Sequence, residues 1–174
     1  QSLTLSNDEV QFERMRWTPD NAVTRIANPI TTDHTILRQS VMPSLLSLLS
    51  ANQHHELPQR VQECGEVVRN HINRWRASWA CAEIGTGFTG AKGIAQALMR
   101  DLGARDDVSF HTIEDGNGPW IPGRGAMVKV GDIPVGEFGE IDPTISEKFG
   151  LKVPIQAGEF DVEALASSIP DPLL

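Results

Sequence analysis

Glycine triplets and a histidine pair are the first residues in this chain whose types could do chemistry. Gly-x-Gly triplets occupy positions 85–87, 116–118 and 123–125, but none has the spacing of a dinucleotide fingerprint or a phosphate-binding loop. We therefore predict that these glycines form turns. His54-His55-Glu56 lacks the i, i+4 spacing that places two imidazoles on one helical face for zinc, so a solvated helix end is expected there.

A second set of polar residues could form a site only if the fold brought their side chains together. Asp33, His34, Arg38 and Ser40 lie in one short segment. A capped helix start accounts for the first two without any chemistry. The sequence gives no reason for the four side chains to converge.

Two glutamates and an arginine stand close together in the C-terminal half. Glu137 and Glu140 are three residues apart on a predicted strand, so they should point to opposite faces and make a poor carboxylate pair. Arg124 could meet an anion, although a surface arginine is the simpler interpretation. No nucleophile comes with a recognisable base, and we predict no catalytic, cofactor-binding or metal-binding residues.

The bulk composition is that of one globular domain spanning residues 1–174. The chain is 40% hydrophobic, and its net charge of −8 argues against a surface that follows nucleic-acid phosphates. No apolar run approaches the ~20 residues of a membrane span. The two cysteines, Cys64 and Cys81, are too few for a disulfide scaffold, so we expect reduced thiols in a cytoplasmic protein with no membrane contact. Because the chain opens at Gln1 without a methionine, we expect it to be part of a longer polypeptide.

The N-terminal region predicts short elements. Ser6 followed three residues later by Glu9 is a capping-box pattern, which predicts a helix over 7–16. A brief second helix is expected where Thr32 or Asp33 can act as the cap.

The strongest local signal is a helix followed by two strands. Pro43 suits the first turn of a helix over 42–52, in which apolar residues recur at helical spacing. This helix is so apolar that it should need more than one partner. After Pro58 the pattern changes to alternation, which predicts strands over 59–68 and 75–84 joined by a hairpin.

The C-terminal half alternates helices and strands. Apolar spacing predicts a helix over 91–102 that ends at Gly103. A glycine- and proline-rich loop is expected over 115–125. Further strands are predicted over 108–112, 126–130, 135–141 and 155–162, and short helices over 143–150 and 163–168. Hairpin-linked strands with helices between them indicate an α+β fold, an antiparallel sheet covered by helices.

The order and spacing of short motifs resemble one protein family. The N-terminal half contains Asn28-Pro29-Ile30, Asp33-His34-Thr35-Ile36-Leu37-Arg38, Pro43-x-Leu45-Leu46 and Leu57-Pro58-Gln59-Arg60-Val61-x-Glu63-x-Gly65. The C-terminal half contains Phe88-Thr89-x-x-Lys92, Gly123-Arg124-x-Ala126 and Gly136-x-x-Gly139-Glu140-Ile141-x-Pro143. Together they resemble phenylalanine–tRNA ligase beta subunits of the archaeal and eukaryotic type, over residues 3–162.

The resemblance implies a catalytic-like domain with a class II aminoacyl-tRNA synthetase-like fold, as a fragment of a longer beta subunit. It implies that the alpha subunit handles phenylalanine, ATP and magnesium, that tRNA is bound by the holoenzyme, and that this domain alone is inactive. The helix through Leu45 and the strand after Pro58 are similar to a degenerate first class II motif, which forms the subunit interface in the family. Gln62 and Cys64 depart from the family, which has apolar residues at these positions on one strand face.

The leading hypothesis is a non-catalytic assembly domain that docks the alpha subunit in a tetramer of two alpha and two beta chains. Its predicted interface residues are Met42, Leu45, Leu48, Leu49, Asn52, Pro58, Arg60 and Val61. The alternative is a free-standing class II-like protein that binds an amino acid or a nucleotide. That alternative predicts a pocket with polar groups near Arg38, Arg124 and Glu140.

Overall fold

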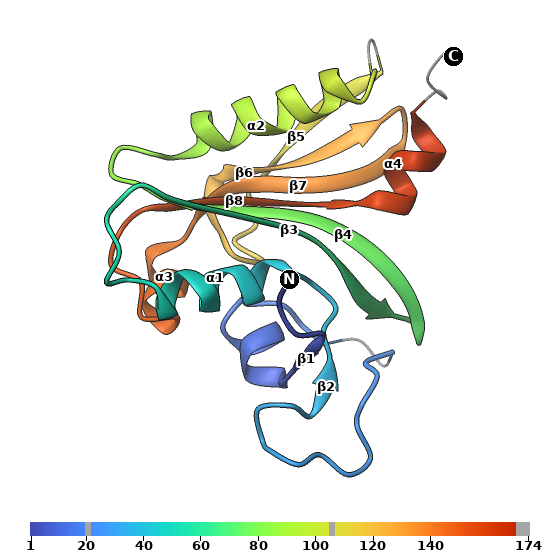
Figure 1. Cartoon of the computed structure of the whole chain (residues 1–174). Coiled ribbons are helices and arrows are strands. Elements are labelled where there is room, and N and C mark those ends of the chain that lie inside the picture. Colours follow the sequence, from blue (N-terminus) through green and yellow to red (C-terminus); the bar gives the residue numbers. More distant parts are fainter. Residues whose placement is uncertain (20–21, 105–106, 170–174) are drawn as a thin grey trace.

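A six-stranded antiparallel sheet forms the centre of the molecule (Figure 1). The computed structural model describes residues 1–19, 22–104 and 107–169. In spatial order the strands are β3 (Gln59–Arg69), β4 (Ile72–Ala82), β8 (Ile155–Asp161), β7 (Ile133–Ile141), β6 (Trp120–Val130) and β5 (Val108–Ile113). The predicted α+β class and its antiparallel sheet are therefore confirmed.

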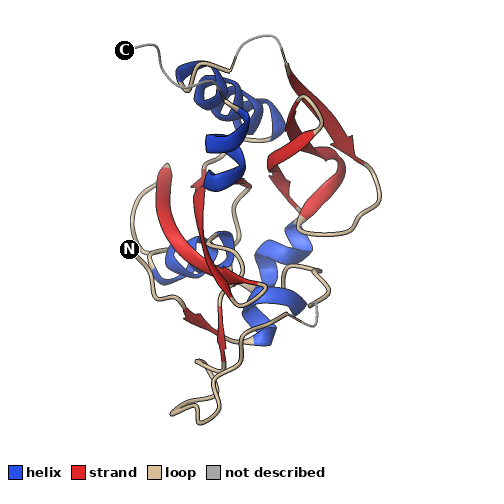
Figure 2. Cartoon of the chain, turned by 90° about the vertical axis from the view of Figure 1, so that its right-hand side faces the viewer, coloured by secondary structure: helices blue, strands red, loops and turns tan. Residues whose placement is uncertain are grey.

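Helices cover both faces of this sheet. α1 (Met42–Ala51) and α3 (Pro143–Lys148) lie on one side, and α2 (Phe88–Asp101) and α4 (Val162–Ser168) lie on the other. Figure 2 shows the strands between the two groups of helices. We call the two sides of the sheet the α1 face and the α2 face. Among the described residues, no helix is both long and apolar enough to cross a membrane.

The α1 face carries the larger apolar core. Leu45 and Leu49 lie one helical turn apart on α1, and both are 1% exposed. They belong to one cluster with Val67 of β3 and Ala80 of β4. The predicted apolar side of this helix therefore packs on the sheet of its own chain.

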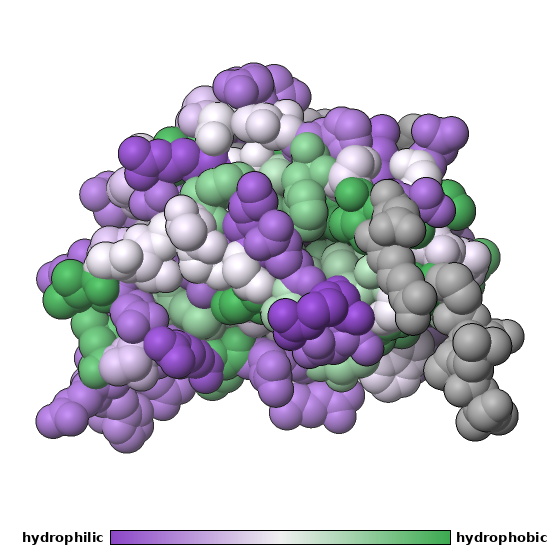
Figure 3. Space-filling view, turned by 90° about the horizontal axis from the view of Figure 1, so that it is seen from above, coloured by the Kyte–Doolittle hydropathy of each residue, from purple (hydrophilic) through white to green (hydrophobic). Residues whose placement is uncertain are grey.

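The α2 face is built from small helix residues and large sheet residues. Ala91 and Ala95 of α2 are fully buried, which lets the helix backbone lie close to the sheet. Phe138 of β7 stacks on Phe88 and meets Phe110 edge-on, with ring centroids 5.5 and 5.7 Å apart. Seen from this side, hydrophobic residues show in small groups between hydrophilic ones (Figure 3).

The predicted helix end and hairpins are confirmed. Gly103 follows α2 with a φ of +83°, the left-handed conformation that glycine adopts without strain. Asn70 and His71 form the two-residue turn between β3 and β4 with φ of 52° and 60°. Two positive φ values in succession are those of a type I′ turn, whose twist matches that of the strands it joins.

The predictions for the N-terminal region were wrong in detail. In place of a helix over 7–16 there is a single π-helical segment, Glu9–Glu13, and the Asn7 side chain accepts from Val10 N–H at 2.9 Å. Ser6 instead belongs to strand β1 (Leu5–Ser6), which pairs with β2 (Ile36–Leu37) where the second helix was expected. Ile36 is fully buried, so burial and strand pairing outweigh the local helix signal.

The glycine-rich loop is shorter than predicted because β6 already begins at Trp120. The indole of Trp120 is 1% exposed and lies against Gly125 and Gly139. A Cβ atom added at Gly125 would lie 2.6 Å from Trp120 Cγ, closer than non-bonded atoms approach. Gly125 and Gly139 make room for the ring, so β6 continues through the segment that was predicted to be a loop.

Candidate functional site

β3 forms one edge of the sheet, and part of its outer side is open. The hairpin pairs Arg69 with Ile72. The backbone N–H and C=O groups of odd-numbered β3 residues therefore bond to β4, and those of even-numbered residues point away from the sheet. Arg38 occupies one end of this side: Val68 N–H donates to its carbonyl at 2.8 Å, and its Nε donates to the Glu66 carbonyl at 2.9 Å. The outward backbone groups beyond this contact belong to Arg60, Gln62 and Cys64. We call residues 60–64 the open edge.

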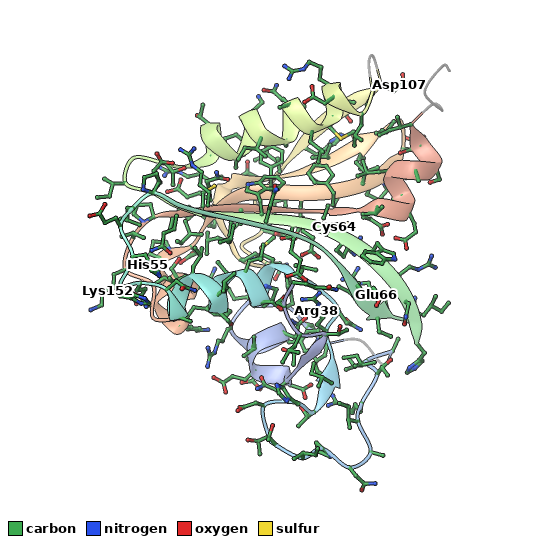
Figure 4. All side chains as sticks on the ribbon, viewed as in Figure 1. Arg38, His55, Cys64, Glu66, Asp107 and Lys152 are labelled. Atoms are coloured by element: carbon green, nitrogen blue, oxygen red, sulfur yellow. The ribbon has the colours of Figure 1, made fainter. Side chains whose placement is uncertain are left out.

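Arg38 is a buried structural cation. Its guanidinium is 0% exposed, and Nη2 lies 2.8 Å from Oε1 of Glu63 (Figure 4 labels Arg38 below the sheet). Ser2 joins the pair, since its N–H and its hydroxyl both donate to Glu63. Loss of hydration raises the pKa of Glu63, but the hydrogen bonds from Ser2 and Arg38 outweigh it and hold that pKa below its ordinary value. This network ties the N-terminus to β3.

A row of side chains crosses the α1 face at one level of the sheet. The successive cross-strand neighbours are Met127, Glu137, Glu159, Ser78 and Glu63. We call Glu63, Glu137 and Glu159 the acid row. Like charges directly opposite one another destabilise a sheet, so each carboxylate needs a compensating group.

Glu159 is compensated by the N-terminus of α1. Its Oε2 accepts from Val41 N–H at 2.9 Å, from Met42 N–H at 2.8 Å and from the Ser40 hydroxyl at 2.9 Å. A helix N-terminus favours a negative charge at this place. Loss of hydration nevertheless raises the pKa of this carboxyl. Glu159 thus positions α1 on the sheet.

Glu137 lies directly opposite Glu159 and has no comparable set of donors. Loss of hydration and then the charge of Glu159 raise its pKa to about 7, against the opposing effects of Trp120, Arg69 and Arg76. The buried Trp120 indole N–H has no hydrogen-bond partner of good geometry among the described residues. It is nevertheless close enough to Glu137 to act as a weak hydrogen-bond donor, which lowers the pKa of that carboxyl.

A cavity of about 480 Å³ opens beside Glu137 and Glu159, between the sheet and the N-terminal segment. Its walls include Phe12, Trp17, Met127, Glu137, Glu159 and Asp161. Asp161 is bound to Arg76 at 2.6 Å and also caps α4. We call this space the α1-face cavity.

A second hollow lies at the N-terminus of α2 on the opposite face. Arg124 and Glu140 line it and form an ion pair at 2.9 Å. Arg38 lies far from it, paired with Glu63 on the α1 face. The single pocket that the binding-protein alternative predicts near these three residues is therefore wrong, although Glu137 and Glu140 do point to opposite faces as predicted.

The other sequence-level candidates also do not form a site. Ser40 bonds to Glu159, whereas Asp33 is exposed. The rings of His54 and His55 lie with their centroids 4.1 Å apart, tilted by 39° to each other, in an exposed segment. Within the described ranges, no three His, Cys, Asp or Glu side chains are grouped to hold a metal ion.

Comparison with known protein families decides what this chain is. The family model of the phenylalanyl tRNA synthetase beta chain CLM domain matches residues 1–162. The chain belongs to this family. The resemblance inferred from the sequence motifs is confirmed.

Archaeal relatives agree with the family model. The CLM domain is 38% identical to the phenylalanine–tRNA ligase beta subunit of Methanopyrus kandleri over 174 residues, which covers 96% of this chain and 29% of the relative. It is 39% identical to the beta subunit of Archaeoglobus fulgidus over 165 residues, covering 94% of this chain and 29% of the relative. The chain therefore spans less than a third of the length of these relatives.

A solved structure confirms the fold class. The pyrrolysyl tRNA synthetase PylSc of Desulfitobacterium hafniense superimposes on the CLM domain with a TM-score of 0.78. The match covers 95% of this chain and 60% of that chain, at 14% sequence identity. At this identity the likeness shows a shared class II synthetase fold.

The predicted interface residues of the CLM domain fall into three groups. Met42, Leu45 and Leu49 are buried in the α1-face core. Asn52 and Val61 are half-buried. Leu48, at 43% exposed, lies on the outer side of α1, and Pro58 and Arg60 are exposed at the start of β3. Contact of these residues with another subunit stays a prediction, and the exposed group is the one a partner could reach directly.

Sequence reasoning missed the pairing of Glu137 with Glu159. It compared Glu137 only with Glu140 on the same strand, because the neighbour on β8 follows from strand order and register. The alternation of Glu159 and Asp161 along the last predicted strand was the available signal: two acids on one face of a strand that the fold buries.

Proposed function

We propose that this CLM domain is a non-catalytic assembly domain, which docks the catalytic alpha subunit of a phenylalanine–tRNA ligase. In this role it supports the ATP-dependent attachment of phenylalanine to its tRNA. The observation that carries the proposal is the open edge of β3, a strand that exposed Pro58 directly precedes; exposed Leu48 lies on α1, which packs on the same sheet.

An open strand edge favours a macromolecular partner over a small ligand. The outward N–H and C=O groups of Arg60, Gln62 and Cys64 can pair with a backbone supplied by another chain. Exposed Leu48 and Leu57 add apolar area near the start of the same strand. The side chains of Gln62 and Cys64 on this strand are exposed.

The rest of the assembly follows from the same proposal. Two alpha and two beta chains would form the complete ligase in the cytoplasm, with the active site on the alpha subunit. ATP and magnesium would be bound there, and tRNA would be bound by the assembled enzyme.

Light-scattering size exclusion of this chain with the matching alpha subunit tests the proposal. We expect a stoichiometric complex, and we expect Leu48→Asp to weaken it at least tenfold because a charge replaces an exposed apolar contact. Ile94→Asp is the matched control, since Ile94 lies mid-helix on α2 and is 38% exposed. Separate elution of the folded wild-type chain, or equal binding by both variants, would show the docking assignment to be wrong.

A further inference from the structure

The end of the β3–β4 hairpin extends past the neighbouring strand. β8 pairs with β4 only from Arg76 to Ala82, so residues 69–75 lie beyond the part of the hairpin that β8 covers. All of residues 69–75 are exposed, and Figure 1 shows this part of the hairpin bending away from the other strands. We call residues 69–76 the hairpin end. A ribbon exposed in this way is available to a partner.

The hairpin end is basic although the chain as a whole has a net charge of −8. Residues 67–82 contain three arginines, Arg69, Arg74 and Arg76, and no aspartate or glutamate. Between the last two arginines stands Trp75, which is 42% exposed. Arginines interleaved with an exposed aromatic ring are typical of surfaces that bind nucleic acid, where the arginines meet phosphates and the ring stacks on a base.

A groove of about 530 Å³ lies between the hairpin end and α4. Its walls carry the same three arginines and two carboxylates, those of Asp161 and Glu163. Asp161 pairs with Arg76 and also caps α4. Glu163 accepts the backbone N–H of Trp75 at 3.0 Å. Both acids are therefore engaged within the chain, and three guanidinium groups against two carboxylates leave the groove with a net positive charge.

We propose that the hairpin end binds unpaired RNA, with the guanidinium of Arg74 on a phosphate and the ring of Trp75 stacked on a base. Consecutive residues of a strand point to opposite faces, so an RNA strand that crosses the end of β4 would meet the arginine on one face and the indole on the other. This inference rests on the proposed binding of tRNA by the assembled enzyme, and it gives that binding a place on this domain.

The exposed ring favours unpaired RNA over a duplex. In a paired A-form helix the bases are stacked on one another and the major groove is too narrow for side chains to read. Unpaired bases at loops and chain ends offer both faces to an aromatic ring. Trp75 is therefore the residue that should distinguish the two forms of RNA, whereas Arg74 can contact a phosphate in either.

Fluorescence anisotropy of a labelled phenylalanine tRNA transcript, titrated with this chain, tests the site. We expect saturable binding that is at least fivefold weaker for Arg74→Gln, because a phosphate contact is lost. Trp75→Leu should also weaken binding at least fivefold, because leucine keeps an apolar side chain but cannot stack on a base. Both residues are exposed, so the two variants should fold. Arg100→Gln is the matched control, since Arg100 is an exposed arginine on α2.

Salt and RNA form give two further measurements on the wild type. Binding should weaken at least fivefold between roughly 50 and 200 millimolar salt, because phosphate contacts release counterions from the RNA. A fully paired RNA duplex of the same length should bind more weakly than the transcript, and Trp75→Leu should have little effect on that binding.

Three results would overturn the proposal. One is no change in anisotropy at about 100 micromolar chain, on the order of the weakest non-specific binding to nucleic acid. Another is equal affinity of Arg74→Gln, Trp75→Leu and Arg100→Gln. The third is loss of alpha-subunit binding by Arg74→Gln with unchanged tRNA binding, which would assign the hairpin end to a subunit contact. The light-scattering assay measures docking separately, so failure of RNA binding and failure of docking can be told apart.

Discussion

At the scale of single residues, the acid row shows how three half-buried carboxylates are tolerated on one sheet face. Glu63 has a direct ion pair with Arg38, Glu159 has a helix N-terminus, and Glu137 has only the smaller effects of Trp120, Arg69 and Arg76. Unequal compensation produces unequal pKa values: that of Glu63 is lowered, and that of Glu137 is raised. Glu137 and Glu159, whose pKa values are both raised, line the α1-face cavity.

Glu137 should make the chain less stable as the pH rises. Its pKa in the folded state is about 7 and its ordinary value is 4.5, so between these pH values the folded chain holds a proton that the unfolded chain has released. The free energy of unfolding should therefore fall across this window and stay lower above it. Glu137→Gln should remove the fall and be more stable at pH 8 by on the order of 3 kcal/mol. Urea unfolding at several pH values measures this, and parallel pH profiles of the two proteins would contradict it.

Arg38 should be far more important for stability than a surface arginine. Arg38→Ala leaves Glu63 buried without its partner, which should cost roughly 3–5 kcal/mol at pH 7. Since the pKa of Glu63 is lowered in the folded state, the stabilisation exists above its ordinary value and is lost as the pH falls through the lowered one. The loss of stability caused by Arg38→Ala should therefore be smaller at low pH.

The matched control is Arg100→Ala. Arg100 pairs with Asp101 on the surface of α2, and its side chain is 75% exposed. This substitution should change stability by less than about 0.5 kcal/mol. Equal urea midpoints of the two variants would show that the Arg38 network does not stabilise the fold.

At the scale of elements, α1 and β3 divide their roles. The apolar side of α1 is used within the chain, while Leu48 and the open edge of β3 face outward. A helix can thus be strongly apolar in sequence and leave only a small part of that surface for a partner. The strand edge provides the backbone groups that the helix lacks.

Proline substitutions can test the outward and inward backbone groups of β3 independently. The N–H of Gln62 faces outward, so Gln62→Pro should leave the fold intact, as proline is tolerated on the open side of an edge strand. It should weaken alpha-subunit binding at least tenfold if the partner pairs with this edge. Val61 N–H bonds toward β4, so Val61→Pro should destabilise the chain by on the order of 2 kcal/mol.

Circular dichroism melts measure the stability of the two proline variants, and the size-exclusion assay measures their binding to the alpha subunit. Loss of folding in Gln62→Pro with retention in Val61→Pro would mean that the outward and inward sides of β3 are assigned the wrong way round. Full binding by a folded Gln62→Pro chain would move the docking surface away from the strand edge.

At the scale of the whole molecule, the CLM domain has a class II synthetase fold in which its own N-terminal segment covers part of the α1 face. The N-terminal segment lies across the α1 face, where Arg38, below the sheet in Figure 4, pairs with Glu63 of β3. What remains is the α1-face cavity, lined by charged groups that mostly compensate one another. The fold is thus compatible with an assembly role.

The sequence alone determined the elements whose signals are local. The helix from Met42, the hairpin after Pro58 and the helix ending before Gly103 follow from periodicity and from residues with fixed backbone preferences. The ordered motifs also identified the family, because their order and spacing can be read from the sequence without knowledge of the fold. The N-terminal pairing of β1 with β2 was missed, since it depends on contacts between segments distant in sequence.

Only the tertiary structure decided which residues are inside and which groups meet. Leu45 and Leu48 look alike in the sequence, but one is 1% and the other 43% exposed. Glu137 and Glu159 become neighbours through strand order and register, and their shared burial changes their pKa values. Burial and electrostatics depend on distances between parts of the chain far apart in sequence, and these distances exist only once the sheet has formed.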